Sequence, residues 1–269
     1  MSRAASFEAM RANVAAMEAG GAFAGGVSPF GDPRLDGMFP AGGLPLGCWH
    51  EVAGEGLEIE MAAVAGAFAA TLARPLAARG AVVWVMRRSD LYAPGLAGLG
   101  FPADRLIQVL ARDEAQVLAA MEGALGAAEV AAAIGEVGTV GLTAGRRLQL
   151  ACEKRGATGF VVRRRPYGAS SGKTDAGGGS AAATRWTVVP SPSEPGTTVL
   201  GHEALGLGAP RWRADLTRCR GGRTGSWIVE MNDGAYPLRV VARLGDRQLE
   251  AAQSAGPDAE SSGLWLRAG

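Results

Sequence analysis

Histidine and cysteine are scarce in this chain of 269 residues, which contains His50, His202 and the three cysteines Cys48, Cys152 and Cys219. An odd number of widely spaced cysteines argues against a disulfide framework. No histidine-rich stretch accompanies them, which also argues against a zinc site. We therefore expect neither disulfide bonds nor a bound metal.

The sequence also lacks a dominant sign of charge and a long hydrophobic run. Its 27 lysines and arginines nearly balance 26 aspartates and glutamates, so no overall attraction to nucleic acid or to a membrane is implied. The longest apolar run, residues 61–73, is shorter than the roughly 20 residues that cross a bilayer. Charged residues interrupt the N-terminal segment, unlike a signal peptide. We expect a cytoplasmic protein that does not contact membranes.

An amphipathic helix is predicted near the N-terminus. Apolar residues recur there at spacings of three and four, which places Phe7, Met10, Val14 and Met17 on one stripe. A Gly- and Ala-rich stretch follows, so residues 1–28 are expected to form this helix and a linker. The stripe either packs on the chain's own domain or docks on another protomer or a partner protein.

The middle of the chain alternates between short apolar runs and helical patterns. The run AVVWVM (Ala81–Met86) is apolar throughout, as in a strand buried on both faces of a parallel sheet. The expected strands are 46–52, 81–86, 106–110, 130–138 and 159–164, and the expected helices are 57–76, 114–125 and 146–156. Repeated βα units with short connections predict an α/β fold with a doubly wound, mostly parallel sheet.

The C-terminal third follows a different pattern. Residues 167–183 are rich in Gly, Ser and Ala without apolar periodicity and are predicted to form a mobile loop. Apolar and polar residues then alternate in the segments 184–189, 210–222, 226–231 and 237–244. We expect these segments to add antiparallel strands at one end of the sheet. The core then spans residues 29–245, followed by a tail at 246–269.

Tryptophan side chains can stack on bases in nucleic-acid-binding proteins. Here most of them are flanked by apolar strand residues, which favours a place in the core. The residues concerned are Trp49, Trp84, Trp186, Trp212 and Trp227.

Several segments resemble the ImuA family. They are FGDPRLDGMFPAGGLPLGCWHEV, DLYAPGL after the second expected strand, RRLQLACEKRG, TRW and PRWRADLTRCRGGRTGSWIVE, and the similarity runs from about residue 30 to residue 241. The resemblance implies a RecA-like fold and a role in DNA-damage-induced mutagenesis. It also implies partners, namely an ImuB-like, catalytically inactive homologue of the Y-family polymerases and the error-prone α subunit of a replicative polymerase. RecA and single-stranded DNA are further candidates.

A RecA-like fold places its phosphate-binding loop directly after the first core strand. A working loop needs two glycines, a lysine for the phosphates and Ser or Thr for Mg²⁺. Aligning Gly54 with the first glycine puts Ile59 at the second glycine, Glu60 at the lysine and Met61 at the Ser or Thr. The loop is thus degenerate, and its glutamates would repel a triphosphate. We expect no bound nucleotide, no cofactor and no ATPase activity.

A second candidate phosphate loop, GASSGKT at residues 168–174, has three residues between its glycines where the motif requires four. No apolar helix follows it, so we interpret it as part of the mobile loop. Lys173 would contribute one phosphate contact if this loop faces DNA. The remaining carboxylate in a metal-adjacent position, Glu136, is expected to form a cap or an internal ion pair.

Arginine is concentrated in two places. Arg163, Arg164 and Arg165 end an expected strand, and five more fall within thirteen residues, namely Arg211, Arg213, Arg218, Arg220 and Arg223. Arginine suits both phosphate recognition and stacking on bases. In a strand, however, Arg211 and Arg213 share one face with Trp212 on the other, the pattern of a half-buried strand. A path for single-stranded DNA, a protein interface and a solvated surface all stay open.

These features predict a non-catalytic accessory protein that bridges a polymerase assembly, and DNA or RecA, during error-prone translesion synthesis. One alternative is a nucleotide-dependent RecA-like ATPase or recombinase, which Glu60 in place of lysine disfavours. A second alternative is a regulatory inhibitor of cell division. No Ser/His/Asp, Cys/His or paired-carboxylate constellation supports another class of enzyme.

Overall fold

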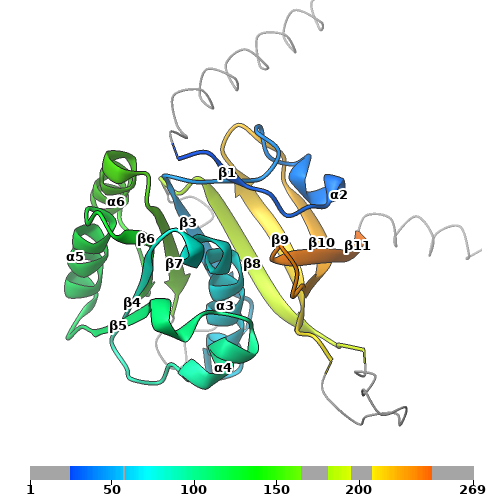
Figure 1. The fold of residues 1–269 in the computed structure, drawn as a ribbon, viewed down its shortest axis with the longest axis horizontal. Helices are drawn as coiled ribbons and strands as arrows, with labels where there is room; N and C mark the ends of the chain where they lie inside the picture. The colour runs from blue at the N-terminus through cyan, green and yellow to red at the C-terminus, as the bar shows by residue number, and fades with distance from the viewer. Residues whose placement is uncertain (1–24, 57, 165–180, 195–207, 244–269) are drawn as a thin grey trace, which may run out of the picture.

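The computed structural model describes residues 25–56, 58–164, 181–194 and 208–243 (Figure 1). In this part of the chain, one nine-stranded sheet has the order β11-β10-β9-β8-β3-β7-β6-β4-β5, and two short strands, β1 and β2, pair with each other. The strands are β1 Val27–Ser28, β2 Leu44–Pro45, β3 Trp49–Gly54, β4 Ala81–Met86, β5 Leu106–Leu110, β6 Val130–Val137, β7 Thr158–Arg163, β8 Thr184–Ser191, β9 Arg211–Cys219, β10 Gly225–Met231 and β11 Leu238–Arg243. The helices are α2 Pro33–Asp36, α3 Glu58–Ala73, α4 Ala93–Gly98, α5 Glu114–Leu125 and α6 Leu142–Arg155, with 3₁₀ turns η1 Arg74–Ala78 and η2 Ala103–Arg105.

The sheet is mostly parallel, as predicted. Strands β8, β3, β7, β6, β4 and β5 run in one direction, and β9, β10 and β11 continue the sheet beyond β8 as an antiparallel meander. One prediction was wrong, because the segment 184–189 was expected to be antiparallel and β8 instead pairs parallel with β3. Only its other edge, toward β9, is antiparallel. A period of two is the same in either direction, so the pattern could not decide it.

Helices cover both faces of the parallel part of the sheet, as in a doubly wound fold (Figure 1). Helix α3 contacts β3, β7 and β8 on one face, while α5 and α6 lie on the other, against β4, β6, β7 and β3. Two apolar clusters result. Phe68 and Trp186 belong to the cluster under α3, and Met121 and Leu148 belong to the cluster under α5 and α6.

The prediction that the tryptophans lie in the core is confirmed. All five named above are at most 3% exposed. Trp186 and Trp212 both pack against Phe68 of α3, with ring centroids 5.6 and 5.7 Å apart. The tryptophan side chains of β8 and β9 therefore hold α3 on the sheet and are not presented to a nucleic acid.

Two predicted helices have shifted ends. The helix expected at 57–76 is α3 followed by η1, since Pro75 has no N–H to continue the α-helical ladder. Helix α6 begins at Leu142, four residues before the predicted start, and ends as predicted at Gly156, whose φ of 74° is the left-handed conformation typical of a helix end.

The first strand also begins later than predicted. It was placed at 46–52, whereas β3 starts at Trp49 because Gly47, with φ of 69°, interrupts the extended run. Leu44 and Pro45, before this bend, pair with β1. The bend at Gly47 thus separates β3 from β2, which belongs to the two-stranded sheet.

Several predictions fall on residues outside the described ranges. These are the helix with Phe7, Met10, Val14 and Met17, most of the loop at 167–183, and the tail at 246–269. The end of that loop is described, and there Ala182 and Ala183 lie outside helices and strands and are fully buried. None of the helices in the described ranges is long and apolar enough to cross a membrane.

Candidate functional site at the carboxyl edge of the sheet

The parallel strands end together at one edge of the sheet, which is where α/β proteins usually bind ligands. The middle strand, β3, continues there into Gly54 and Glu55 before α3 begins. The backbone N–H of Glu55 donates to the carbonyl oxygen of Val188 on β8, at 3.2 Å. This N–H is therefore committed to the sheet and does not point into an open loop.

Met61, in the first turns of α3, lies against the end of β3. A Cβ added to Gly54 would stand 2.6 Å from the Cβ of Met61, so glycine is required by close packing. Met61 is half-buried at this position. The backbone of Ile59 and Glu60 belongs to α3, and their side chains lie outside what the structure describes.

Glu136, at the end of β6, is the centre of a buried polar network. One carboxylate oxygen accepts from the indole Nε1–H of Trp84 at 2.8 Å, and the other accepts from Arg164 at 2.9 Å. Arg164 also donates to Asp90, in the segment after β4, at 2.9 Å. The prediction of an internal ion pair for Glu136 is confirmed, and Arg164 ties the ends of three strands together.

A second buried carboxylate, Glu51 of β3, binds arginines on both neighbouring strands. Arg163 of β7 donates to one oxygen at 2.6 Å, and Arg185 of β8 donates to the other at 3.1 Å. The Glu51 side chain is 4% exposed. A buried carboxylate needs such partners, since losing water without replacing its hydrogen bonds costs several kcal/mol. The sequence prediction did not identify Glu51 or Arg185, although an acid within an apolar strand was a usable signal.

The first half of β9 carries a third set of ion pairs. Arg213 binds Glu55 of the loop after β3 and also Asp215 on its own strand, the latter at 3.2 Å. Arg211 binds Glu230 of β10 and Glu194, just after β8. The predicted alternation is confirmed, because Trp212 is buried on the opposite face.

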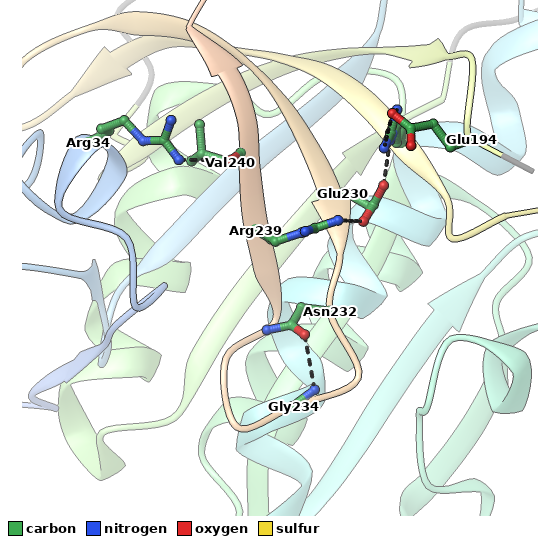
Figure 2. Close-up of polar contacts among 8 residues, drawn as sticks. Arg34, Glu194, Glu230, Asn232, Gly234, Arg239 and Val240 are labelled. Carbon is green, nitrogen blue, oxygen red and sulfur yellow. Dashed lines mark hydrogen bonds and ion pairs between the residues drawn. The ribbon is translucent and has the colours of Figure 1, made fainter. Parts of the chain in front are cut away.

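Glu230 joins two strands of the antiparallel meander. Figure 2 shows its carboxylate between Arg239 of β11 and the arginine that also reaches Glu194. Burial alone would raise the pKa of this carboxyl, but the hydrogen bonds from Arg239 and Arg211 hold it below its ordinary value. The hydrogen bonds that Arg211 makes to Glu230 and Glu194 raise the pKa of Arg211. Both partners therefore stay charged.

The remaining arginines lie far from this edge. Arg218 is opposite Arg185 in the β8–β9 ladder, and the Arg220 backbone N–H donates to the carbonyl of Ala183, at the start of β8. The Arg223 side chain donates to the carbonyl oxygen of Gly37 at 2.9 Å. A strand rises about 3.4 Å per residue, so β9 separates its first and last arginines by roughly 24 Å. The five residues that the sequence groups together thus form no single patch, and Arg165 and Lys173 fall outside the described ranges.

A buried polar chain that the sequence did not indicate lies at the other end of β3. His50 donates from Nε2 to the carbonyl of Pro45 at 2.9 Å, and its Nδ1 lies 2.8 Å from the hydroxyl of Thr184. That hydroxyl also accepts from the indole N–H of Trp186 at 3.1 Å. Burial lowers the pKa of His50 to about 4, so the ring is neutral at neutral pH. A fully bonded, neutral histidine of this kind serves the fold.

The described ranges contain no cluster of residues that could bind a metal ion. No three side chains of His, Cys, Asp and Glu come together there in a way that would hold an ion. The thiols of Cys48 and Cys152 are buried, and burial raises the pKa of both, that of Cys152 to about 12. Neither is poised as a thiolate nucleophile or ligand.

Comparison with known proteins identifies the family. Protein ImuA from two strains of Caulobacter vibrioides is 54% identical to this chain over 244 residues, which cover 88% of the chain and 98% of each relative. The chain belongs to the ImuA family. No family model matches the sequence. Among solved structures, SulA from Pseudomonas aeruginosa aligns with 43% of the chain and 96% of its own, at a TM-score of 0.37 and 19% identity, which is too low to bear on the fold.

In this member of the ImuA family, the carboxyl edge is crossed by ion pairs. Glu51, Glu55 and Glu136 each bind at least one arginine from a neighbouring strand end. Such pairs join the strands to one another and leave these arginines engaged with carboxylates. An anionic ligand would have to displace a carboxylate before Arg163, Arg164 or Arg213 could bind it.

Proposed function

We propose that this chain is a non-catalytic accessory protein of DNA-damage-inducible, error-prone DNA synthesis. Its membership in the ImuA family, at 54% identity over nearly the full length of the relatives, supports a role in inducible mutagenesis. The proposed partners are an ImuB-like inactive Y-family polymerase homologue and the error-prone α subunit of a replicative polymerase. RecA and single-stranded DNA are secondary candidates.

The observation that carries the non-catalytic part is the loop between β3 and α3. In a RecA-like arrangement this loop would bind phosphate, but Glu60 stands at the lysine position and the half-buried Met61 at the hydroxyl position. The Glu55 N–H is bound to Val188, and the Glu55 carboxylate is bound to Arg213. A triphosphate would meet glutamates with no lysine to balance them. This supports a degenerate loop in a protein that acts by binding and not by hydrolysis.

Nucleotide binding is tested with the purified full-length protein and a fluorescent ATP analogue in the presence of Mg²⁺. We expect no binding and no ATP turnover, for the wild type and for Glu60→Ala alike. Saturable binding with turnover that is lost on changing Lys173 or Glu136 would instead support the ATPase or recombinase alternative.

Partner binding is tested by recovering the tagged full-length protein from DNA-damaged cells and identifying co-purified proteins by mass spectrometry. We expect the inactive polymerase homologue. The variant Met10→Asp/Val14→Asp tests whether the N-terminal stripe docks the partner, with Glu8→Lys as a control outside the stripe. Filamentation on overexpression, without a change in mutation frequency, would favour the inhibitor of cell division.

A further inference from the structure

One edge of the sheet is left open by a short apolar strand. Strand β5, Leu106–Leu110, is the outermost of the parallel strands, and within the described ranges it pairs only with β4. Ile107 is 49% exposed and Leu110 is 65% exposed, on opposite faces of this strand. An apolar edge strand with unpaired backbone groups is a template for another strand.

The opposite edge of the same sheet is protected. Strand β11 carries the exposed Arg239 and Arg243, and Arg34 donates to the carbonyl oxygen of Val240 at 2.8 Å (Figure 2). Charged side chains and a capped carbonyl are the usual means by which an edge avoids pairing. Strand β5 itself, with the sequence LIQVL, contains no charged residue.

The backbone of β5 shows which of its groups face outward. Ala111, just after the strand, donates its N–H to the carbonyl of Met86 on β4 at 2.8 Å. Because backbone groups alternate in direction along a strand, Ile107 and Val109 also point toward β4. The N–H and C=O groups of Gln108 and Leu110 and the C=O of Leu106 therefore point away from the sheet, where a further strand would bind them. The Leu106 N–H is already bound to the carbonyl oxygen of Ala103 in η2.

We propose that a second copy of this chain pairs with β5 as an antiparallel strand, with a two-fold axis at Gln108. The sequence LIQVL matches its own reverse in the apolar or polar character of each position. The axis puts Gln108 opposite itself, Ile107 opposite Val109 and Leu106 opposite Leu110. The Gln108 pair exchanges two main-chain hydrogen bonds, and in each Leu106–Leu110 pair the Leu110 N–H donates to the Leu106 carbonyl, so about four main-chain hydrogen bonds form across the axis. A symmetric pairing of one patch with itself is the commonest route to a dimer.

The charges next to the strand fit this direction. Asp104 and Arg112 lie four positions before and four after Gln108, and both are exposed. The antiparallel arrangement brings Arg112 of one copy toward Asp104 of the other, twice over. A parallel pairing in register would bring Asp104 toward Asp104 and Arg112 toward Arg112, which is unfavourable. Charge complementarity thus selects the antiparallel dimer, independently of the function proposed above.

Sedimentation velocity on the purified full-length protein tests the proposal. We expect twice the mass of the chain at concentrations of about 100 μM, with dissociation on dilution. Leu110→Lys is expected to weaken the dimer at least tenfold, because it puts a charge against Leu106 of the second copy. Leu150→Lys is the matched control, since Leu150 on α6 is 66% exposed and lies far from β5, and it is expected to leave the dimer unchanged. A monomer at every concentration, or a dimer that Leu110→Lys does not weaken, would overturn the proposal.

The register is tested separately. Gln108→Cys places one cysteine at the axis, and we expect a short bis-maleimide to cross-link two such chains. The wild type is the control and is expected not to cross-link, because its own cysteines are buried or half-buried. Arg112→Asp is expected to weaken the dimer, and the double variant Asp104→Arg/Arg112→Asp to restore it. Failure of both the link and the rescue would show that any dimer uses another surface.

Discussion

Acidification from pH 7 to pH 5 is expected to remove about 2 kcal/mol of folding stability through His50 alone. The ring is fully buried, and burial lowers its pKa from 6.5 to about 4, although the hydrogen bond to the Pro45 carbonyl acts in the opposite direction. Between these two values the unfolded chain binds a proton that the folded chain excludes. The contribution is therefore fully present above pH 6.5 and is lost as the pH falls toward 4.

The magnitude follows from the two pKa values. A pKa difference of one corresponds to about 1.4 kcal/mol, so the difference between 6.5 and about 4 amounts to roughly 3 kcal/mol at the acid limit. At pH 5 most unfolded chains are protonated at His50 and most folded chains are not, which gives about 2 kcal/mol. Cys48, whose Sγ lies 3.7 Å from Nε2, adds no charge, because burial raises the pKa of this thiol.

The assay is urea unfolding at a series of pH values, with wild type and His50→Gln compared at each. Glutamine retains a donor for Pro45 and an acceptor for Thr184 but does not titrate. Every other titrating group is common to both proteins, so the difference between the two curves isolates the histidine. We expect wild type to lose about 2 kcal/mol more than the variant between pH 7 and pH 5. Parallel curves would refute the assignment of a buried neutral ring.

Three further predictions follow from single contacts. Arg164→Met is expected to lower the free energy of unfolding by about 3 kcal/mol, because it leaves the buried Glu136 carboxylate without its cation, and Arg164→Lys should restore part of the loss in the same urea assay. Gly54→Ala is expected to cost about 1–3 kcal/mol, since its Cβ would overlap the Cβ of Met61, and an unchanged melting temperature would contradict this contact. Cys219, whose pKa burial raises to about 11, is expected to react with iodoacetamide at pH 8 far more slowly than it does in the denatured chain, as measured by mass spectrometry.

The sequence predicted those parts of the fold in which a residue pattern is compatible with only one type of structure. The apolar run Ala81–Met86 is a central parallel strand, and Gly156 ends a helix. Strand direction was not predictable for β8, because its alternation records only which face is buried. The short helix α2 was missed, although Asp32 caps it and Pro33 occupies its first turn, both of which are usual signals of a helix start.

The candidate site was less predictable, because its contacts join residues distant in sequence. Glu51 meets Arg163 and Arg185 only because β3 lies between β7 and β8. The closely spaced arginines of β9 suggested one basic patch, yet a strand carries its residues apart along its length. Spacing in the sequence is thus a guide to a shared face and not to a shared location.

The number of arginines in β7–β9 has a physical reason in the acids that they neutralise. The Glu51 side chain is 4% exposed and binds two guanidinium groups. The Glu230 side chain is 10% exposed and binds two others. Moving such an arginine onto a DNA phosphate would remove one of the two guanidinium partners of a buried carboxylate, at a cost of up to about 3–5 kcal/mol. A single surface contact with phosphate does not offset that cost in water. The described arginines at this edge are therefore better explained as internal counter-ions of the sheet than as a path for single-stranded DNA.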